Sequence, residues 1–241
     1  KGPIGAFIGF VHAYQDARIS LERLEEIHFQ EDEDQTNKLK INQISLLEKD
    51  IHLNNITFGY LGEKIPPVLK NVSFTIPHNK TTAIVGESGS GKTTLIKLLL
   101  GYYEPQQGEI LIGNTNLKNL NNKLWRSSCG SVMQDGFIFS ATIAENIAIS
   151  DNSINIDKLY YAASLANIND FIETTPEGYN TKIGSDGNGI SQGQRQRLLI
   201  ARSIYKDPAY LFFDEATNAL DANNEIIGYE FVNLGRMMEM I

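Results

Sequence analysis

The stretch Gly86-Glu87-Ser88-Gly89-Ser90-Gly91-Lys92-Thr93 decides the fold of this chain of 241 residues. It fits the pattern G-x-x-x-x-G-K-[S/T], which occurs where a strand ends and a helix begins. The preceding residues 81–85 end in an apolar run, which predicts a short buried strand. Residues 93–100 are apolar on most faces and are followed by Gly101, which predicts a buried helix that ends there. This order of strand, glycine-rich loop and helix predicts an α/β domain with a phosphate-binding loop.

The residue types of the loop suit the chemistry of a nucleoside triphosphate. Glycines let successive backbone N–H groups face a phosphate at the positive end of the following helix. We expect Lys92 to reach the β- and γ-phosphates and the Thr93 hydroxyl to ligate Mg²⁺. A chance match to the pattern has a probability of about 1% in a chain of this length, given average residue frequencies. The predicted nucleotide-binding residues of this stretch are Gly86, Glu87, Ser88, Gly89, Ser90, Gly91, Lys92, Thr93 and Thr94.

A second candidate element is the run Tyr210-Leu211-Phe212-Phe213-Asp214-Glu215. Four apolar residues followed by two acids place the carboxylates at the C-terminal end of a buried strand, the edge where α/β proteins bind ligands. We expect Asp214 to hold the metal through its shell and Glu215 to polarise the attacking water. Acids at a strand end also cap the following helix, so the functional interpretation depends on the phosphate loop.

Composition narrows the class of protein. Hydrophobic residues make up 41% and charged residues 21%, as in an ordinary globular protein. The net charge of −8 argues against a non-specific nucleic-acid binder, which needs a basic surface. The single cysteine, Cys129, excludes an internal disulfide. The apolar run at residues 4–11 is far shorter than the roughly 20 residues that a spanning helix needs.

The chain divides by pattern into three regions. Residues 1–29 form an amphipathic helix by their apolar spacing, residues 30–50 form a linker rich in acids and amides, and residues 51–241 form the folded domain. Within the domain, alternating or continuous apolar runs predict strands at residues 51–60, 68–76, 109–112 and 209–213. Residues 141–172 are predicted to be largely helical.

A third motif, Ile190-Ser191-Gln192-Gly193-Gln194-Arg195-Gln196-Arg197, resembles the signature of ATP-binding cassettes. On the residues alone, Ser191 and Gln194 form an S-x-x-Q capping box at the start of a helix, and a capped helix start is also an anion site. In the family this helix start binds the γ-phosphate held by the other subunit, so the resemblance implies that role for Ser191, Gln192, Gly193 and Gln194. Gln192 stands where the family usually has glycine, and its side chain would crowd the close approach or add a donor. A kinase or GTPase is disfavoured because neither needs this signature.

Further matches extend the resemblance from about residue 51 to residue 221. Tyr60 lies where the family has an aromatic that stacks on adenine, worth about 0.5–1.5 kcal/mol, although a partly buried strand tyrosine would look the same. Gln134 matches the glutamine that links Mg²⁺ to the membrane-facing region, and Asp221 lies in the loop between the two sites. Residues 136–146 and 181–187 resemble exporter segments. The leading helix, residues 16–27, resembles the cytoplasmic extension of an exporter's last transmembrane helix, particularly in peptide and bacteriocin exporters with an upstream protease domain.

A histidine that the family has after the Asp-Glu pair is missing from this sequence. The family has a histidine that contacts the γ-phosphate on the strand after the Asp-Glu pair, but the four histidines here all precede the phosphate loop. Residues 228–241 do not resemble the family well. We therefore expect a C-terminally truncated cassette that lacks this strand, exposes an edge of its sheet, and binds nucleotide more readily than it hydrolyses it.

The resemblance implies a P-loop NTPase fold with a parallel core sheet, an antiparallel β subdomain and a helical subdomain. It implies ATP and Mg²⁺ as ligands, with Thr93, Gln134 and Asp214 at the metal and Lys92 and Glu215 in catalysis. The implied partners are a second nucleotide-binding domain in a head-to-tail dimer and an exporter's transmembrane domains, at the cytoplasmic face of the cell membrane, with no nucleic acid. Two alternatives remain: a cassette that binds ATP without hydrolysing it, and a soluble cassette ATPase without a membrane partner.

Overall fold

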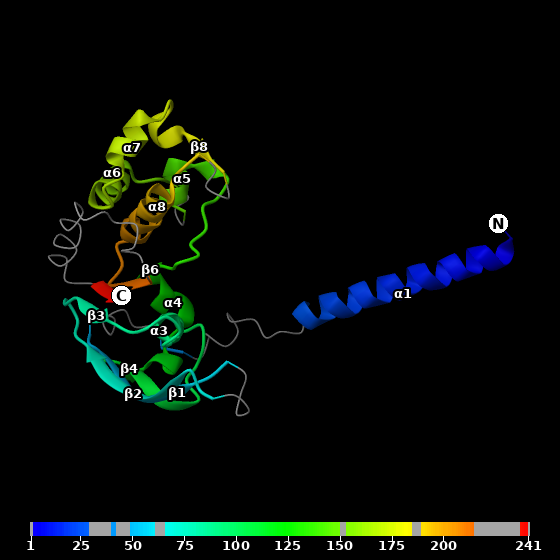
Figure 1. Cartoon of the computed structure of the whole chain (residues 1–241), viewed down its shortest axis with the longest axis horizontal. Coiled ribbons are helices and arrows are strands. Elements are labelled where there is room, and N and C mark those ends of the chain that lie inside the picture. The colour runs from blue at the N-terminus through cyan, green and yellow to red at the C-terminus, as the bar shows by residue number, and fades with distance from the viewer. Residues whose placement is uncertain are drawn as a thin grey trace. The chain divides into compact units, whose positions relative to one another are not determined.

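The computed structural model describes residues 2–28, 40–41, 49–60, 66–149, 153–184, 189–214 and 237–240. The chain forms two compact units, Lys1–Lys40 and Ile41–Ile241, and this division falls inside the predicted linker. The first unit contains the predicted helix, α1, which spans Pro3–His28 (Figure 1). Its large apolar side chains are exposed from Ile4 to Leu24. Among the residues described, no helix is both long and apolar enough to span a bilayer.

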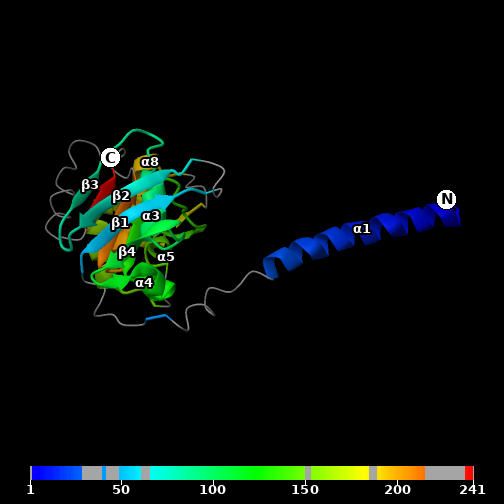
Figure 2. The ribbon, with the colours of Figure 1, turned by 90° about the horizontal axis from the view of Figure 1, so that it is seen from below.

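The second unit begins with an antiparallel sheet in the order β2-β1-β4-β5 (Figure 2). Its strands are β1 (Ile51–Phe58), β2 (Leu69–Ile76), β4 (Gln107–Ile112) and β5 (Thr115–Asn116). Alternation in β1 buries Ile51, Leu53, Ile56 and Phe58, as expected for a sheet with one covered face. The predicted strands at residues 51–60, 68–76 and 109–112 are confirmed.

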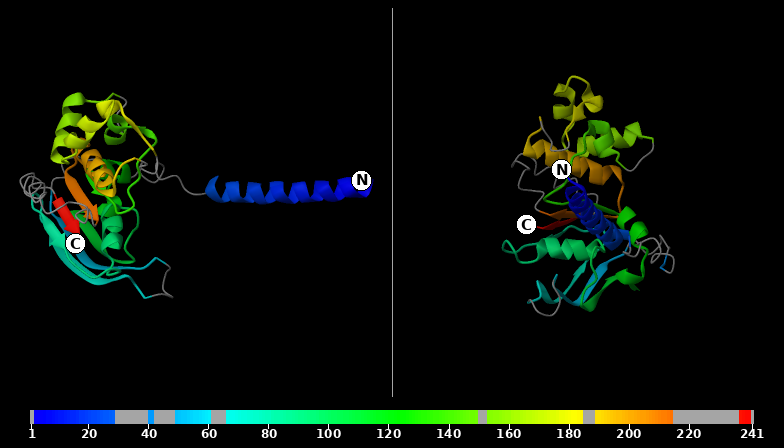
Figure 3. Two further views of the ribbon diagram at one scale, coloured as in Figure 1. Left: turned by 45° about the horizontal axis from the view of Figure 1, so that its top comes forward. Right: turned by 90° about the vertical axis from the view of Figure 1, so that its right-hand side faces the viewer.

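A parallel sheet, in the order β3-β10-β9-β6, forms the core. It consists of β3 (Thr82–Ile84), β10 (Met237–Met240), β9 (Tyr210–Asp214) and β6 (Cys129–Val132). All five residues of β9 are buried, because this strand has a neighbour on each side and α3 (Lys92–Leu99) packs on it. Figure 3 shows α3 between the two sheets and α8 on the other side of the core sheet.

Two expectations about this sheet are wrong. The strand before the phosphate loop is not buried: Ala83 is exposed and Val85, just after β3, is 75% exposed, because only the face that carries Ile84 packs against an apolar cluster and the alternate face is open. The core sheet also does not lack a strand between the phosphate-loop strand and the Asp-Glu strand. Residues Met237–Met240 lie there, paired in parallel with β3 and β9. This strand could not be predicted from the sequence, because its four residues, Met-Met-Glu-Met, are too few to show the alternation of apolar and polar residues that identifies a strand.

The helices after the phosphate loop form a second layer and a helical subdomain. They are α4 (Asn122–Ser127), α5 (Ile143–Ile147), α6 (Ile156–Leu165), α7 (Asn169–Thr174) and α8 (Gln192–Tyr205), with 3₁₀ turns at Leu117–Asn119 and Gly178–Asn180. A short hairpin pairs β7 (Ala141–Thr142) with β8 (Lys182–Ile183). The largely helical character predicted for residues 141–172 is confirmed. One apolar cluster joins α5, α6, α7 and α8 to β6 and β9, and another joins the antiparallel sheet to α3 and α4. The phosphate loop starts the helix of the second cluster, and the signature segment starts the longest helix of the first.

Candidate functional site

The phosphate loop connects β3 to α3, and two glycines give it its curl. Gly89 and Gly91 have φ values of +81° and +96°, in the left-handed region that favours glycine. A side chain at Gly91 would also meet a neighbour, since its Cβ would lie 2.8 Å from Leu69 Cδ2. Gly91 caps α3, and its carbonyl accepts the first helical hydrogen bond from Leu95 at 2.9 Å. The loop therefore leads the backbone directly into a helix N-terminus, the expected site for a phosphate.

Lys92 lies across this loop. Its ammonium donates to the carbonyl oxygen of Gly86 at 2.6 Å and to that of Glu87 at 3.2 Å. Both acceptors belong to the first two residues of the loop, so the lysine charge stands beside the curled backbone. This is the position from which a lysine point charge can neutralise phosphate oxygens.

The loop and the acidic strand end are joined by a direct hydrogen bond. Thr93 Oγ1 donates to Asp214 Oδ2 at 2.7 Å, across 121 residues of sequence. Asp214 is only 2% exposed and terminates β9, the buried strand of the core sheet. The sequence predicted both residues as metal ligands, and the fold brings them together.

The donor chemistry of this pair fits Mg²⁺ held together with phosphate. A hydroxyl and a carboxylate are oxygen ligands, which Mg²⁺ prefers. The described residues contain no group of three or more histidine, cysteine, aspartate or glutamate side chains that could cage a metal by themselves. A Mg²⁺ ion at Thr93 and Asp214 would therefore need further oxygens, and substrate phosphates and water supply them in such sites.

The predicted base-stacking residue, Tyr60, follows the end of β1 and is 46% exposed. Its hydroxyl is 3.0 Å from Thr94 Oγ1 at the start of α3, next to Thr93. Its ring packs at nearly right angles against Phe58 and Tyr103, with centroid distances of 5.2 and 5.3 Å. Tyr60 is thus anchored to the phosphate-loop helix while its ring remains partly open to solvent.

The signature segment starts α8 through the predicted capping box. Gln194 N donates to Ser191 Oγ at 3.2 Å, and Ser191 N donates to Gln194 Oε1 at 2.8 Å. Gln192 is exposed in the first turn. It lines a polar cleft of about 500 Å³ together with Gln134 and Asp135 from the segment after β6. The two glutamines singled out from sequence therefore face one cleft.

Sequence reasoning missed two arginines on α8 that hold the segment after Gln134. Arg195 donates to Gly136 O through Nε and Nη2, at 3.2 and 2.7 Å. Arg202 donates to Phe137 O and to Asn146 O, both at 2.7 Å, and its guanidinium lies 5.4 Å from the centre of the Phe139 ring. Burial lowers the pKa of Arg202 to about 10, so it stays charged at neutral pH. The two arginines lie two turns apart on one face of a helix, and this spacing was the available signal.

Asn146, on α5, forms further hydrogen bonds to the segment that the two arginines hold. Its side chain is 1% exposed; it accepts from Phe139 N at 2.8 Å and donates to Phe139 O and Thr142 O, each at 3.0 Å. Arg202 also donates to Asn146 Oδ1 at 3.1 Å. The segment between Gln134 and α5 is therefore tied by side chains to the helix that carries the signature motif.

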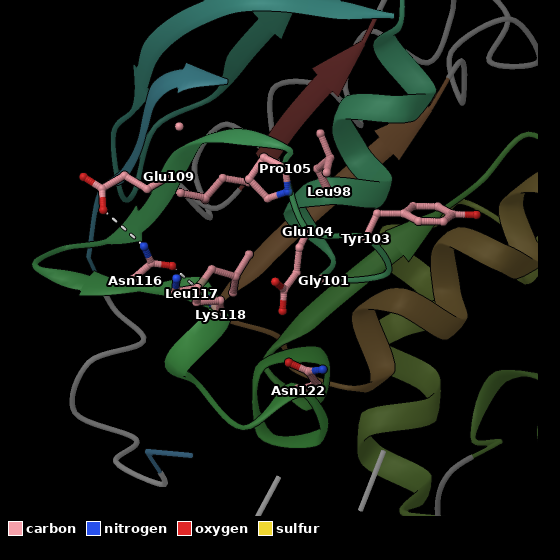
Figure 4. Close-up of a pocket in the computed structure, with 12 residues that line it drawn as sticks. Leu98, Gly101, Tyr103, Glu104, Pro105, Glu109, Asn116, Leu117, Lys118 and Asn122 are labelled. Atoms are coloured by element: carbon pink, nitrogen blue, oxygen red, sulfur yellow. Dashed lines mark hydrogen bonds between the residues drawn. The ribbon is translucent and has the colours of Figure 1, made fainter. Parts of the chain in front are cut away.

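Several predicted residues lie outside the described part of the chain. These are Glu215 and Asp221, together with residues 185–188 of the exporter-like loop. A separate pocket of about 110 Å³ lies at the C-terminal end of α3, between β4, β5 and α4 (Figure 4). It is lined by Glu104, Glu109 and Lys118 but by none of the predicted site residues.

Known proteins resemble this chain in sequence and in fold. The family described as ABC transporter matches residues 69–218. The leukotoxin translocation ATP-binding proteins LktB of Mannheimia haemolytica and Bibersteinia trehalosi are each 41% identical over 214 residues, which is 89% of this chain and 30% of theirs. A solved structure of a bacterial Atm1-family ABC exporter with ATP bound superposes with a TM-score of 0.80 at 29% identity, covering 94% of this chain and 40% of that one. The chain thus spans about a third of the length of the relatives that it matches.

Proposed function

The chain belongs to the ABC transporter family, with exporter-type members among its relatives, and we propose that it binds and hydrolyses Mg-ATP to power export. The observation that carries the proposal is the 2.7 Å hydrogen bond between Thr93 and Asp214. It joins the end of the phosphate loop to the end of the buried β9 strand, where a metal-bound triphosphate needs both groups.

Each residue of the site has a role in this proposal. Thr93 and Asp214 hold Mg²⁺, which neutralises charge on the β- and γ-phosphates, and Gln134 approaches the metal from its loop. Lys92, now bonded to two loop carbonyls, turns its charge to the phosphate oxygens. Glu215, the residue after Asp214, acts as base toward the attacking water.

We further propose that the working unit is a two-fold dimer of such domains. The start of α8, with its Ser191–Gln194 capping box, presents backbone N–H groups and the positive end of a long helix. In the head-to-tail arrangement this helix start meets the γ-phosphate held by the partner subunit, and Asp221 connects the two sites. Closure then drives an exporter's transmembrane domains from the cytoplasmic face of the membrane. A toxin as the exported cargo is supported by relatives whose name is leukotoxin translocation ATP-binding protein.

A second candidate function, ATP binding without efficient hydrolysis, is favoured by one observation. Strand β10, the neighbour of β9 in the core sheet, reads Met237-Met-Glu-Met240 and carries no histidine. Without a contact from a histidine to the γ-phosphate, a closed site would hold ATP and turn it over slowly.

The test measures binding and turnover on the same sample. Calorimetric titration with Mg-ATP gives the affinity, and released phosphate gives the rate. We expect binding by the wild-type chain and a loss of binding in Lys92→Ala. We also expect Glu215→Gln to bind as the wild type does while any turnover falls on the order of 10²–10⁴-fold. Binding without any phosphate release in the wild type would select the second candidate, and no binding at all would contradict both.

A further inference from the structure

The orientation of Tyr60 depends on a residue outside every motif of the site. We infer that Gln106 is a positioning residue for the nucleotide base: it fixes the backbone before Tyr60 and so presents the ring for stacking. The inference rests on the proposed function, because it needs the base to stack on Tyr60.

The first observation concerns how β1 ends. Its backbone pairing with β4 runs to Thr57 and Gln107, where Gln106 N still donates to Thr57 O at 3.0 Å. Beyond this point the side-chain amide of Gln106, and no longer the backbone of β4, makes the hydrogen bonds to the segment after β1. Gly59 N donates to Gln106 Oε1 at 3.1 Å, and Gln106 Nε2 donates to Gly59 O at 2.9 Å. The amide thus satisfies both polar groups of the residue immediately before Tyr60.

The second observation is the tight fit around Gly59. This residue is buried, and a Cβ built on it would lie 3.3 Å from Pro67 Cα and 3.9 Å from Gln106 Oε1. Gly59 is therefore confined between the Gln106 amide and the backbone at Pro67. The direction in which the chain leaves β1 is set by that confinement.

The third observation links the same segment to the ring. Three residues before Gln106, the ring of Tyr103 packs against Tyr60 at an interplanar angle of 87°. Tyr103 is 43% exposed, and Figure 4 shows its ring pointing away from Glu109 and Asn116. The segment after α3 therefore contacts the ring of Tyr60 through Tyr103 and the backbone of the preceding residue, Gly59, through Gln106. The Tyr60 hydroxyl also lies 3.0 Å from Thr94 Oγ1, so contacts hold the ring itself, its hydroxyl and the backbone just before it.

The experiment separates a role in base positioning from a role in folding. Affinities for Mg-ATP and for inorganic tripolyphosphate with Mg²⁺ are measured for the wild type, Gln106→Ala, Gln106→Glu and the neighbouring control Gln107→Ala. Tripolyphosphate has no base, so it reports the phosphate loop alone. We expect Gln106→Ala to weaken ATP binding about 3- to 10-fold, the range of one aromatic contact, and to leave tripolyphosphate binding unchanged. Gln106→Glu, which keeps the acceptor for Gly59 N–H and loses the donor, should fall in between, and Gln107→Ala should match the wild type.

Two results would overturn the inference: equal weakening of both ligands in Gln106→Ala, which indicates a purely structural role, or no change in ATP binding. Tyr60→Ala separates this failure from failure of the premise. If Tyr60→Ala leaves ATP affinity intact, the base does not stack on Tyr60 and the base-binding part of the proposed function is wrong. If Tyr60→Ala weakens ATP but Gln106→Ala does not, the inference alone fails. In the double variant, Gln106→Ala should add no further loss, because its effect passes through Tyr60.

Discussion

Two glycines of the phosphate loop provide a matched pair of substitutions, Gly91→Ala and Gly89→Ala. Both positions have left-handed φ values, so alanine at either position costs about 1–2 kcal/mol in backbone strain. Their surroundings differ. A Cβ at Gly89 meets nothing within 4 Å, whereas one at Gly91 would lie 2.8 Å from Leu69 Cδ2 and 3.1 Å from Val68 Cγ1. Leu69 is buried in the β2 strand and has little room to move, so overpacking adds about 1–3 kcal/mol at Gly91.

We therefore expect Gly89→Ala to lower the free energy of unfolding by about 1–2 kcal/mol and Gly91→Ala by about 2–5 kcal/mol. Urea titration followed by circular dichroism measures both values, and an unchanged slope with denaturant shows that the unfolded state is the same. Equal destabilisation by the two substitutions would mean that Gly91 does not approach β2 closely, contrary to the distances above.

Three further substitutions follow from the described contacts. Ser191→Ala removes the side-chain cap of α8 and should lower the free energy of unfolding by about 1 kcal/mol in the same urea assay; an unchanged midpoint would show that the cap contributes nothing. Arg202→Lys cannot reproduce the planar fork that reaches Phe137 and Asn146, so it should cost about 1–3 kcal/mol, and full stability would show that a point charge suffices. The pKa of Glu145 is held below its ordinary value by the backbone N–H of Thr142 and then by its hydroxyl. This stabilisation is complete above the ordinary glutamate pKa and is lost as the pH falls through the lowered one, and Thr142→Val should raise the Glu145 pKa part of the way in an NMR titration; no rise would remove the hydroxyl from that role.

The sequence predicted the parts of the site that depend on local pattern. The phosphate loop, the continuous apolar run before Asp214 and the capping box at Ser191 each follow from a few neighbouring residues, and the structure contains all three. Thr93 and Asp214 were each predicted as ligands of Mg²⁺, and in the structure a hydrogen bond joins them.

The rest could not be predicted because it depends on contacts between distant segments. Arg202 binds backbone carbonyls more than 50 residues away, and the periodicity of a sequence does not identify the partner of a side chain. In the sequence, nothing distinguishes Gln106 from other polar loop residues. Its role depends on the fold, which brings Gly59 within hydrogen-bond distance of it. The exposure of Ala83 on β3 and the pairing of β10 between β3 and β9 depend on how distant segments pack, which local pattern does not determine.

In the function proposed above, Thr93 and Asp214 form a metal-assisted triphosphate site with the phosphate loop. The most direct test is the Mg²⁺ dependence of ATP affinity in the wild type and in Asp214→Asn, which keeps the shape of the side chain and removes its charge. We expect Mg²⁺ to strengthen ATP binding by the wild type and Asp214→Asn to lose most of this gain, roughly 10-fold in affinity. The same gain in affinity from Mg²⁺ in both proteins would contradict the proposed metal site.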